Sequence, residues 1–240
     1  MAEKEFDVGR KLHESGFIGF IKFICLFQCY DDTSKQLRKT KEQEPPSYTT
    51  VRICNAQNKT SVNYKHVLVM PYIPNGSIAT YSWIDNFEIL KSISIHTVLT
   101  LANAFDKMGF IHNDLNWGNV LFKKTTVEQI TYTFGKTTLS VPINGYKVVI
   151  ADFEKVVWAK DNNYLFWTNI LMFFTRTNIT NPVGKFIRWQ TNEIIQFIDK
   201  MIVKRKPVAN IVKFIPLIQI SSFTIYNIEN VPQYDPNIFG

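Results

Sequence analysis

The sequence of 240 residues predicts an α+β fold, with strands and helices in separate stretches rather than in strict alternation. Residues 64–72 read YKHVLVMPY and run into a Pro-Asn-Gly turn, which is typical of a strand and its exit. From Ile95 to Met108 the apolar residues recur at helical spacing, and Gly109 stands where a C-terminal cap is expected. From about Tyr164 onward the apolar residues mostly follow helical spacing as well.

Between the long helix and the helical end, short segments rich in β-branched and aromatic residues predict strands. Asn144-Gly145 is a dipeptide typical of hairpin turns. In the helical end, Ile187–Met201 has an apolar face and predicts a helix. The predicted strands are Val120–Lys123, Ile130–Phe134, Thr138–Val141 and Tyr146–Ala151.

The composition indicates a folded chain with a moderate basic excess. Hydrophobic residues make up 45% of the sequence, and the formal net charge is +7. A solvated basic face explains this charge better than nucleic-acid binding, because the lysine-rich stretches lack interleaved aromatic residues. We therefore expect no direct nucleic-acid binding. The apolar runs are too short to cross a bilayer, and the three cysteines suit a reducing compartment, so we expect an intracellular protein without membrane contact.

The chain divides at a polar stretch. Residues 31–61 are rich in Lys, Gln, Thr and Asn and contain Pro45-Pro46, which predicts a loop insertion. This stretch separates a short N-terminal piece from the larger remainder.

The residues that indicate chemistry lie in the segment FIHNDLNWGNVLFKK, Phe110 to Lys124. Here His112, Asp114 and Asn119 satisfy the pattern H-x-D-L-x-x-x-N, and Asp152 follows the last predicted strand in VVIADFEK. Phosphoryl transfer needs one carboxylate that accepts a proton from a hydroxyl, and oxygen ligands that hold Mg²⁺ against the phosphates. The paired motifs are more specific than an isolated Asp-rich turn.

These motifs resemble those of the eukaryotic protein kinases, H-R-D-L-x-x-x-N and D-F-G. The Trp-Gly-Asn in the loop, the enlarged hairpin before Asp152 and the GFIGF segment at 16–20 are similar to the haspin-type atypical serine/threonine kinases. This resemblance implies a protein-kinase-like fold with a reduced N-terminal lobe and a mainly helical C-terminal lobe. Residues 1–72 would form the N-terminal lobe, with an αC-like helix, the insertion 31–61 and a hinge strand. Residues 73–240 would form the C-terminal lobe.

The resemblance also implies roles for single residues. Asp114 would be the catalytic base, and Asn119 and Asp152 would bind Mg²⁺. Glu5 would correspond to the αC glutamate that pairs with a nucleotide-binding lysine, or alternatively would be a solvated acid near the N-terminus. Positions expected to contact ATP are Met70, Pro71 and Tyr72 at the hinge, Leu121 on the pocket floor, and Ala151. We expect His112 to be a packing residue, and Asn116 and Trp117 to be structural residues of the loop.

The sequence departs from the family pattern at several positions. No Gly-rich loop or lysine-bearing strand precedes Glu5 in the sequence, Asn113 replaces the Arg of H-R-D, and Glu154 replaces the Gly of D-F-G. The segment between Asp152 and Tyr164 is short. Trp167 stands where the family has a buried Asp that supports the catalytic loop, so we expect this loop to lack that support.

Two functions, and one alternative concerning the sequence itself, remain open. The chain is expected to be an ATP- and Mg²⁺-dependent serine/threonine kinase with a protein substrate, by resemblance a histone tail in the nucleus. The cytoplasm is the other location considered. Alternatively, it is a pseudokinase or a kinase fragment that binds other molecules. A third alternative is that an upstream segment carrying the Gly-rich loop and the lysine is missing from the sequence.

Overall fold

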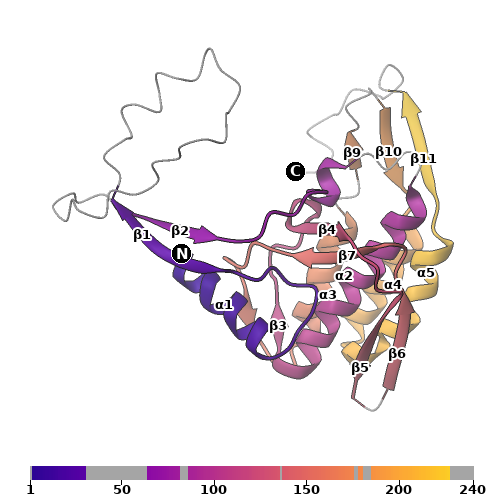
Figure 1. Cartoon of the computed structure of the whole chain (residues 1–240). Coiled ribbons are helices and arrows are strands. Elements are labelled where there is room, and N and C mark those ends of the chain that lie inside the picture. The colour runs from indigo at the N-terminus through magenta and orange to yellow at the C-terminus, as the bar shows by residue number, and fades with distance from the viewer. Residues whose placement is uncertain are drawn as a thin grey trace, which may run out of the picture.

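The computed structural model has an α+β fold, as predicted (Figure 1). It describes residues 2–30, 64–81, 86–135, 137–175, 178–180 and 185–227. The predicted insertion at 31–61 lies outside these residues. Among the described helices, none combines the length and the apolar content needed to cross a bilayer.

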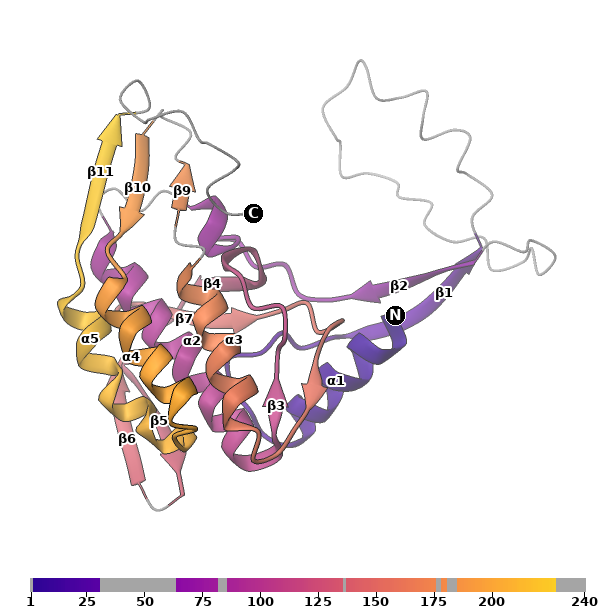
Figure 2. The same ribbon diagram turned by 180° about the vertical axis from the view of Figure 1, so that it is seen from behind.

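The N-terminal part consists of one helix and one antiparallel strand pair. Helix α1 (Ala2–Glu14) buries Val8 and Leu12 and contacts both β1 (Cys25–Tyr30) and β2 (Tyr64–Val69). Figure 2 shows α1 beside this strand pair, at one end of the molecule. The loop after α1 then runs along β7 (Tyr146–Ile150), because the amide of Ile150 donates to the Gly19 carbonyl and the amide of Ile21 donates to the Ile150 carbonyl, both at 2.8 Å. This loop therefore joins the N-terminal part to the rest.

Helix α2 (Phe87–Met108) forms the centre of the molecule. Its middle residues, 92–102, are buried on all sides, which is the pattern of a core helix. The helix begins two turns before the predicted start at Ile95, where Phe87 stacks on Phe223 with ring centroids 4.3 Å apart. It ends as predicted at Gly109, whose φ of 71° is left-handed and whose amide donates to the Phe105 carbonyl. A Cβ at Gly109 would lie 2.4 Å from the Lys160 amide nitrogen, so glycine is required there.

Antiparallel strand pairs follow α2, and all four predicted strand segments are confirmed. Strands β4 (Val120–Lys124) and β7 form one pair, and β5 (Gln129–Phe134) and β6 (Thr137–Pro142) form the hairpin inserted between them. The short strands β3 (Phe110–Ile111) and β8 (Val157–Trp158) pair next to the loop of interest. The hairpin prediction for Asn144-Gly145 is wrong. This turn connects β6 to β7, which do not pair with each other, because β7 pairs with β4 while β6 pairs back on β5.

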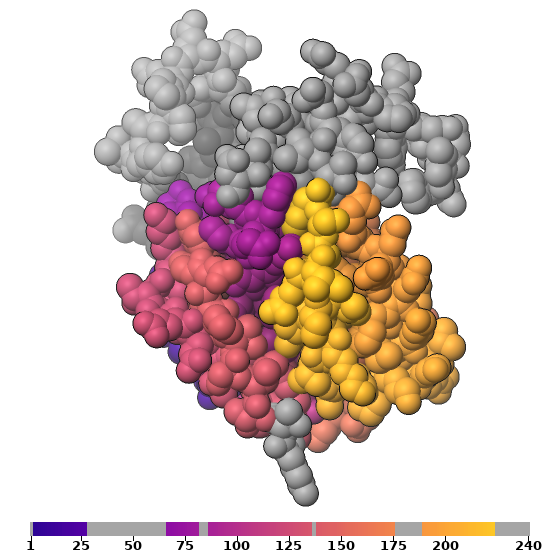
Figure 3. Space-filling view, turned by 90° about the vertical axis from the view of Figure 1, so that its right-hand side faces the viewer, coloured from indigo at the N-terminus to yellow at the C-terminus, as the bar shows by residue number. Residues whose placement is uncertain are grey.

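The C-terminal part contains α3 (Asn163–Thr175), α4 (Asn192–Val203), the 3-10 segment η3 (Val208–Lys213) and α5 (Ile215–Ile220). Helix α5 contacts both α2 and α4, and Figure 3 shows this C-terminal region, in yellow, between the α2 side and α4. A three-stranded sheet adds β10 (Lys185–Trp189) between β9 (Asn178–Thr180) and β11 (Phe223–Asn227).

The prediction of a continuous helix over Ile187–Met201 is therefore wrong at its start. Residues up to Trp189 belong to β10, and α4 begins only after Thr191. The indole of Trp189 is buried and stacks on Phe223 of the neighbouring strand, with ring centroids 5.0 Å apart. Strand pairing and this aromatic contact outweigh the helical spacing of the apolar residues.

Candidate functional site

The loop predicted to be catalytic connects β3 to β4 and is held by its own polar side chains. The Asn116 side-chain oxygen accepts from the Gly118 amide at 2.8 Å, and its Nδ2 donates to the Asp114 carbonyl at 3.1 Å. The 3-10 turn η2 (Trp117–Asn119) follows directly, and the Trp117 indole donates to the Phe173 carbonyl of α3 at 3.0 Å. The predicted structural roles of Asn116 and Trp117 are confirmed by these bonds.

Asn119 connects the loop to the end of β7. Its Nδ2 donates to the Asp114 carbonyl at 3.0 Å, and its own carbonyl accepts from the Ala151 amide at 2.9 Å. Because Nδ2 is engaged, the Oδ1 atom is the part of this side chain left to bind a cation. Asp152 follows Ala151 and has a φ of 66°, a left-handed conformation that is uncommon for a residue other than glycine. The structure thus brings Asp114, Asn119, Ala151 and Asp152 together.

His112 provides a second connection between the same two segments. Its Nε2 lies 2.8 Å from the Ala151 carbonyl, which can only accept, so Nε2 carries the proton. The ring is fully buried, and burial lowers the pKa of His112. A buried neutral imidazole bonded to the backbone is a packing residue, as predicted.

The loop is also supported from α3, contrary to the expectation. Trp167 is buried, and its indole donates to the Lys206 carbonyl at 2.8 Å, away from the loop. Two residues further along the helix, the buried Asn169 accepts a hydrogen bond from the Asn113 amide through Oδ1, at 2.9 Å. Asn113 has a φ of 59°, so this bond stabilises a left-handed residue next to Asp114. The loop therefore has a supporting side chain, and the expectation from Trp167 was wrong because an amide two positions away serves instead of a carboxylate.

The Asp114 carboxylate has an ion-pair partner that was not predicted. Lys155 donates from Nζ to Asp114 Oδ2 at 3.0 Å, with side-chain exposures of 56% for Lys155 and 25% for Asp114. This hydrogen bond and the charge of Asp114 raise the pKa of Lys155, and Glu154 and Asp152 act in the same direction. An ammonium group thus lies among the carboxylates of the site. The sequence feature that could have indicated this ion pair is the position of Lys155, three residues after Asp152.

Glu5 reaches the segment after Asp152 from α1. Its Oε1 accepts from the Phe153 amide at 3.3 Å, and the neighbouring Lys4 donates from Nζ to the Glu154 carbonyl at 2.8 Å. Burial raises the pKa of Glu5, and the charges of Asp152 and Glu154 add to this effect. Glu5 therefore lies near the site, bonded to a backbone amide. Among the described residues, no lysine forms an ion pair with it.

Phe153 joins the N-terminal part to the loop through aromatic contacts. The ring is fully buried. It makes edge-type contacts with Phe20, Phe23, Phe110 and His112, at centroid distances of 5.9–6.2 Å. These rings come from the loop after α1, from β3 and from the catalytic loop, so the position of Asp152 depends on all three.

The predicted hinge residues lie on the segment between β2 and η1 (Ile78–Thr80). Met70 and Tyr72 are 43% and 87% exposed, so both side chains are open to solvent. Leu121 is half-buried and forms an antiparallel bridge with Ser77, which places it beside the chain that follows the hinge. Ala151 is likewise half-buried.

The chemistry of the oxygen donors fits Mg²⁺. A carboxylate from Asp152 and an amide oxygen from Asn119 are hard ligands, and this metal commonly takes its remaining ligands from water and phosphate. In the described part of the chain, no group of three or more His, Cys, Asp or Glu side chains forms a closed metal cage. The donors therefore suit a metal that arrives with a phosphate ligand better than a structural zinc ion.

The similarity to known proteins agrees with this geometry. The chain is 41% identical over 76 residues to serine/threonine-protein kinase haspin of Mus musculus, and 41% identical over 83 residues to that of Bos taurus. A probable serine/threonine-protein kinase of Dictyostelium discoideum is 32% identical over 78 residues. These segments cover 32%, 35% and 31% of this chain, but only 10%, 11% and 6% of the relatives.

A family model described as the ABC1 atypical kinase-like domain matches residues 33–159, which is more than half of the chain. The partial identity to haspin supports a protein kinase-like function and a haspin-type domain. The chain belongs to the ABC1 atypical kinase-like family.

Proposed function

We propose that this protein is a haspin-like serine/threonine protein kinase that transfers the γ-phosphoryl group of ATP to a Ser or Thr hydroxyl of a protein. The observation that carries this proposal is the joining of the two motif segments. Asn119 is bonded to both the Asp114 carbonyl and the Ala151 amide, which connects the backbone of the proposed proton acceptor to the backbone that leads into Asp152. A fixed separation of these oxygen atoms is what this chemistry requires.

Each residue has a defined part in the proposed reaction. Asp114 would orient the substrate hydroxyl and accept its proton at the carboxylate. Asn119 Oδ1 and the Asp152 carboxylate would hold Mg²⁺, which, when bound with ATP, offsets the negative charge of the phosphates. The exposed side of Met70 and Tyr72, together with Leu121 and Ala151, would receive the adenine.

Lys155 has to leave Asp114 Oδ2 before a hydroxyl can approach that oxygen. The lysine side chain is more than half exposed, so it can move without breaking core contacts. When the carboxylate accepts a hydroxyl, the ammonium group is well placed to face the negatively charged phosphates that enter beside it. Lys155 would thus neutralise Asp114 in the free protein.

The decisive test is Asp114→Asn, which keeps the size of the side chain and removes its basicity. Transfer of labelled γ-phosphate to a Ser/Thr peptide should fall about 100-fold or more, the usual contribution of a general base. The control is Asp199→Asn on the exposed side of α4, which should keep full activity. Equal activity of Asp114→Asn and wild type, with both variants folded, would rule out the proposed mechanism.

A second candidate is a catalytically impaired pseudokinase that serves as a binding module. Two observations favour it: Lys155 occupies the Asp114 carboxylate, and Glu5 is bonded to a backbone amide rather than to a lysine among the described residues. Thermal unfolding with millimolar Mg-ATP separates the candidates, since only a ligand that binds the native state raises the Tm. The kinase should show a Tm increase that Asp152→Asn removes, and the binding module should show none.

Other features remain proposals that rest on the resemblance. We propose residues 1–72 as a reduced N-terminal lobe and residues 73–240 as the C-terminal lobe. A protein substrate is supported by the serine/threonine-protein kinases that the chain resembles. A histone tail as that substrate, a nuclear or cytoplasmic location, and the absence of direct nucleic-acid or membrane binding are also proposed.

A further inference from the structure

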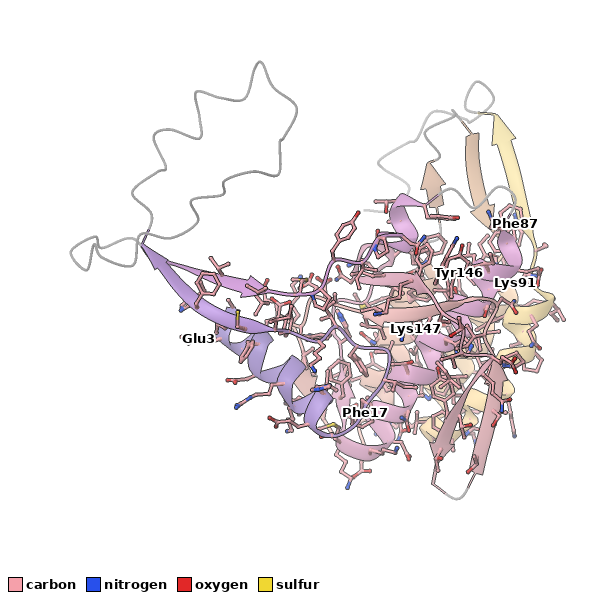
Figure 4. All side chains as sticks on the ribbon, viewed as in Figure 1. Glu3, Phe17, Phe87, Lys91, Tyr146 and Lys147 are labelled. Carbon is pink, nitrogen blue, oxygen red and sulfur yellow. The ribbon has the colours of Figure 1, made fainter. Side chains whose placement is uncertain are left out.

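An apolar cavity of about 300 Å³ lies behind the hinge. One wall is the loop after α1, including Phe17 and Phe20, and the opposite wall is formed by β4, β7 and the start of β5. Figure 4 labels one residue from each wall, Phe17 and Lys147. Gly19 in the first wall has a φ of 85°, and a Cβ there would lie 2.9 Å from the Thr100 side chain, so the loop packs closely on α2. The cavity is therefore formed by well-packed elements.

This cavity meets the proposed nucleotide site only at Pro71. Pro71 and Ile73 of the hinge line it, whereas Met70 and Tyr72 do not. Leu121 and Ala151, which are also proposed to contact ATP, do not line the cavity. None of the proposed catalytic or metal-binding residues lines the cavity.

Three lysines, Lys22, Lys123 and Lys147, line the cavity together with its apolar residues. Lys123 and Lys147 are directly opposite each other on the antiparallel strands β4 and β7. Side chains at such positions point to the same side of the sheet and lie close together, and two like charges there are destabilising. The charge pair thus has a cost to stability that some other function should offset.

No acidic side chain neutralises these lysines in the described part of the chain, where the ion pairs involve other residues. The acid nearest in sequence on these walls is Glu128, whose side chain is exposed. A second hollow, of about 780 Å³, shares Lys123 and Lys147 with the cavity and adds Lys124. The positive charge therefore extends beyond the cavity as a strip along the strand ends.

Apolar side chains are exposed next to these charges. Ile18 is 53% exposed and Val127 is 47% exposed, and both line the cavity. An apolar opening beside unneutralised ammonium groups is complementary to a ligand that carries both an apolar group and several negative charges.

We propose that this cavity is a docking site for an acidic peptide segment of a partner protein, with one large apolar residue as its anchor. The anchor would enter the cavity between Phe17 and Ile130, and acidic residues on either side would pair with Lys22, Lys123 and Lys147. A peptide suits the site because the charges extend over two neighbouring hollows, which a ligand with a single carboxylate would leave mostly unpaired. This proposal does not depend on phosphoryl transfer.

The test uses the full chain and a short fluorescent peptide with a central Leu between glutamates, measured by fluorescence anisotropy. The double variant Lys123→Gln, Lys147→Gln should weaken binding about fivefold or more, as expected from the loss of two exposed ion pairs. Val127→Ser should weaken it as well, because the anchor loses apolar contact. Lys213→Gln, an exposed lysine on η3, is the matched control and should bind as wild type does.

Further measurements distinguish a peptide site from a general anion site. A peptide with Ser in place of the central Leu should bind more weakly than the Leu peptide, and one with Lys in place of Glu should not bind. Equal affinity for the Leu and Ser peptides, or unchanged affinity in the lysine double variant, would overturn the proposal. Equally tight binding of a single-stranded oligonucleotide of the same charge would also overturn it in favour of nonspecific anion binding.

The unfolding midpoint of the double variant gives an independent measurement. Removing a like-charge pair with no function should leave the native protein equally or more stable in urea. Weaker peptide binding in a variant that is at least as stable as wild type supports a docking site. Loss of stability together with loss of binding would show that the lysines are structural, and would contradict the proposal.

Discussion

The catalytic loop and the segment after Asp152 contribute to the same site but are held in different ways. The loop donates hydrogen bonds to the Asn169 side chain and to the Phe173 carbonyl, both on α3, and the Asn119 carbonyl accepts one from the Ala151 amide after β7. The segment after Asp152 is fixed by the buried ring of Phe153 and by two bonds to α1. Asp114, the proposed proton acceptor, thus rests on the C-terminal part, while Asp152, the proposed metal ligand, also depends on the N-terminal part. A shift of α1 should therefore alter the position of Asp152, and with it the proposed metal binding, more than the position of Asp114.

The largest effect is expected in the segment after Asp152, which depends on the buried ring of Phe153. Phe153→Ala should lower the free energy of unfolding by about 3–5 kcal/mol, because it leaves a cavity among aromatic side chains from three elements. Urea unfolding followed by tryptophan fluorescence measures this loss. Phe153→Leu is the control and should cost clearly less. A loss below about 1 kcal/mol for Phe153→Ala would show that this segment is held mainly by its polar bonds.

A smaller effect is expected for the hydrogen bond that holds the loop. Asn169→Ala should cost about 1–3 kcal/mol, since it leaves the Asn113 amide without its acceptor. Asn169→Asp keeps an acceptor at the same position and should restore most of the stability. The same pair of variants should differ in phosphate transfer to a peptide if the protein is a kinase. Equal stability of the Ala and Asp variants would show that this bond does not hold the loop.

Low pH should lower the free energy of unfolding, because His112 in the catalytic loop is buried. Burial lowers the pKa of His112 and also that of His96, which contacts the Pro142 carbonyl through Nε2 at 2.8 Å. For a lowered pKa, the unfolded chain takes up protons first, so stability is full above the ordinary value of 6.5 and falls below it. The slope should reach at most about 1.4 kcal/mol per pH unit for each histidine.

Urea unfolding at a series of pH values from neutral to about pH 5 measures this slope. His96→Gln should reduce it, whereas His13→Gln, at an exposed position of α1, should leave it unchanged. A stability that does not change over this range would contradict the neutral, buried state of both rings.

The smallest effect is expected for the exposed ion pair between the two regions. Lys155→Gln should leave the urea midpoint almost unchanged, because an exposed ion pair contributes little to folding. A destabilisation as large as that of Asn169→Ala would show that Lys155 is a structural connection between the regions rather than a mobile counter-ion.

The sequence was sufficient for those parts of the molecule that depend on local patterns. The strands around the inserted hairpin, the end of α2 at Gly109 and the order of elements followed from residue spacing and turn residues. The motif residues His112, Asp114, Asn119 and Asp152 could be grouped because phosphoryl transfer requires such a set. The structure adds the hydrogen bonds that connect Asp114, Asn119 and Ala151.

Contacts between distant residues could not be predicted in the same way. The support from Asn169 was not predicted, because the family pattern has a supporting carboxylate at position 167. An amide oxygen two residues later accepts the hydrogen bond equally well. The ion pair between Lys155 and Asp114 depends on how the segment after Asp152 folds back over the catalytic loop. The start of β10 was misassigned because one of its two partner strands, β11, lies more than thirty residues later in the chain. Each error concerns a partner that local spacing does not reveal.

The close approach at Gly109 has a consequence for interpreting genetic variants. Any side chain at this position would push against the Ala159–Lys160 backbone, which closes the short segment that starts at Asp152. A saturation screen should therefore show position 109 as intolerant, although it contributes no chemical group to the reaction. A harmful substitution there would not by itself indicate a ligand contact.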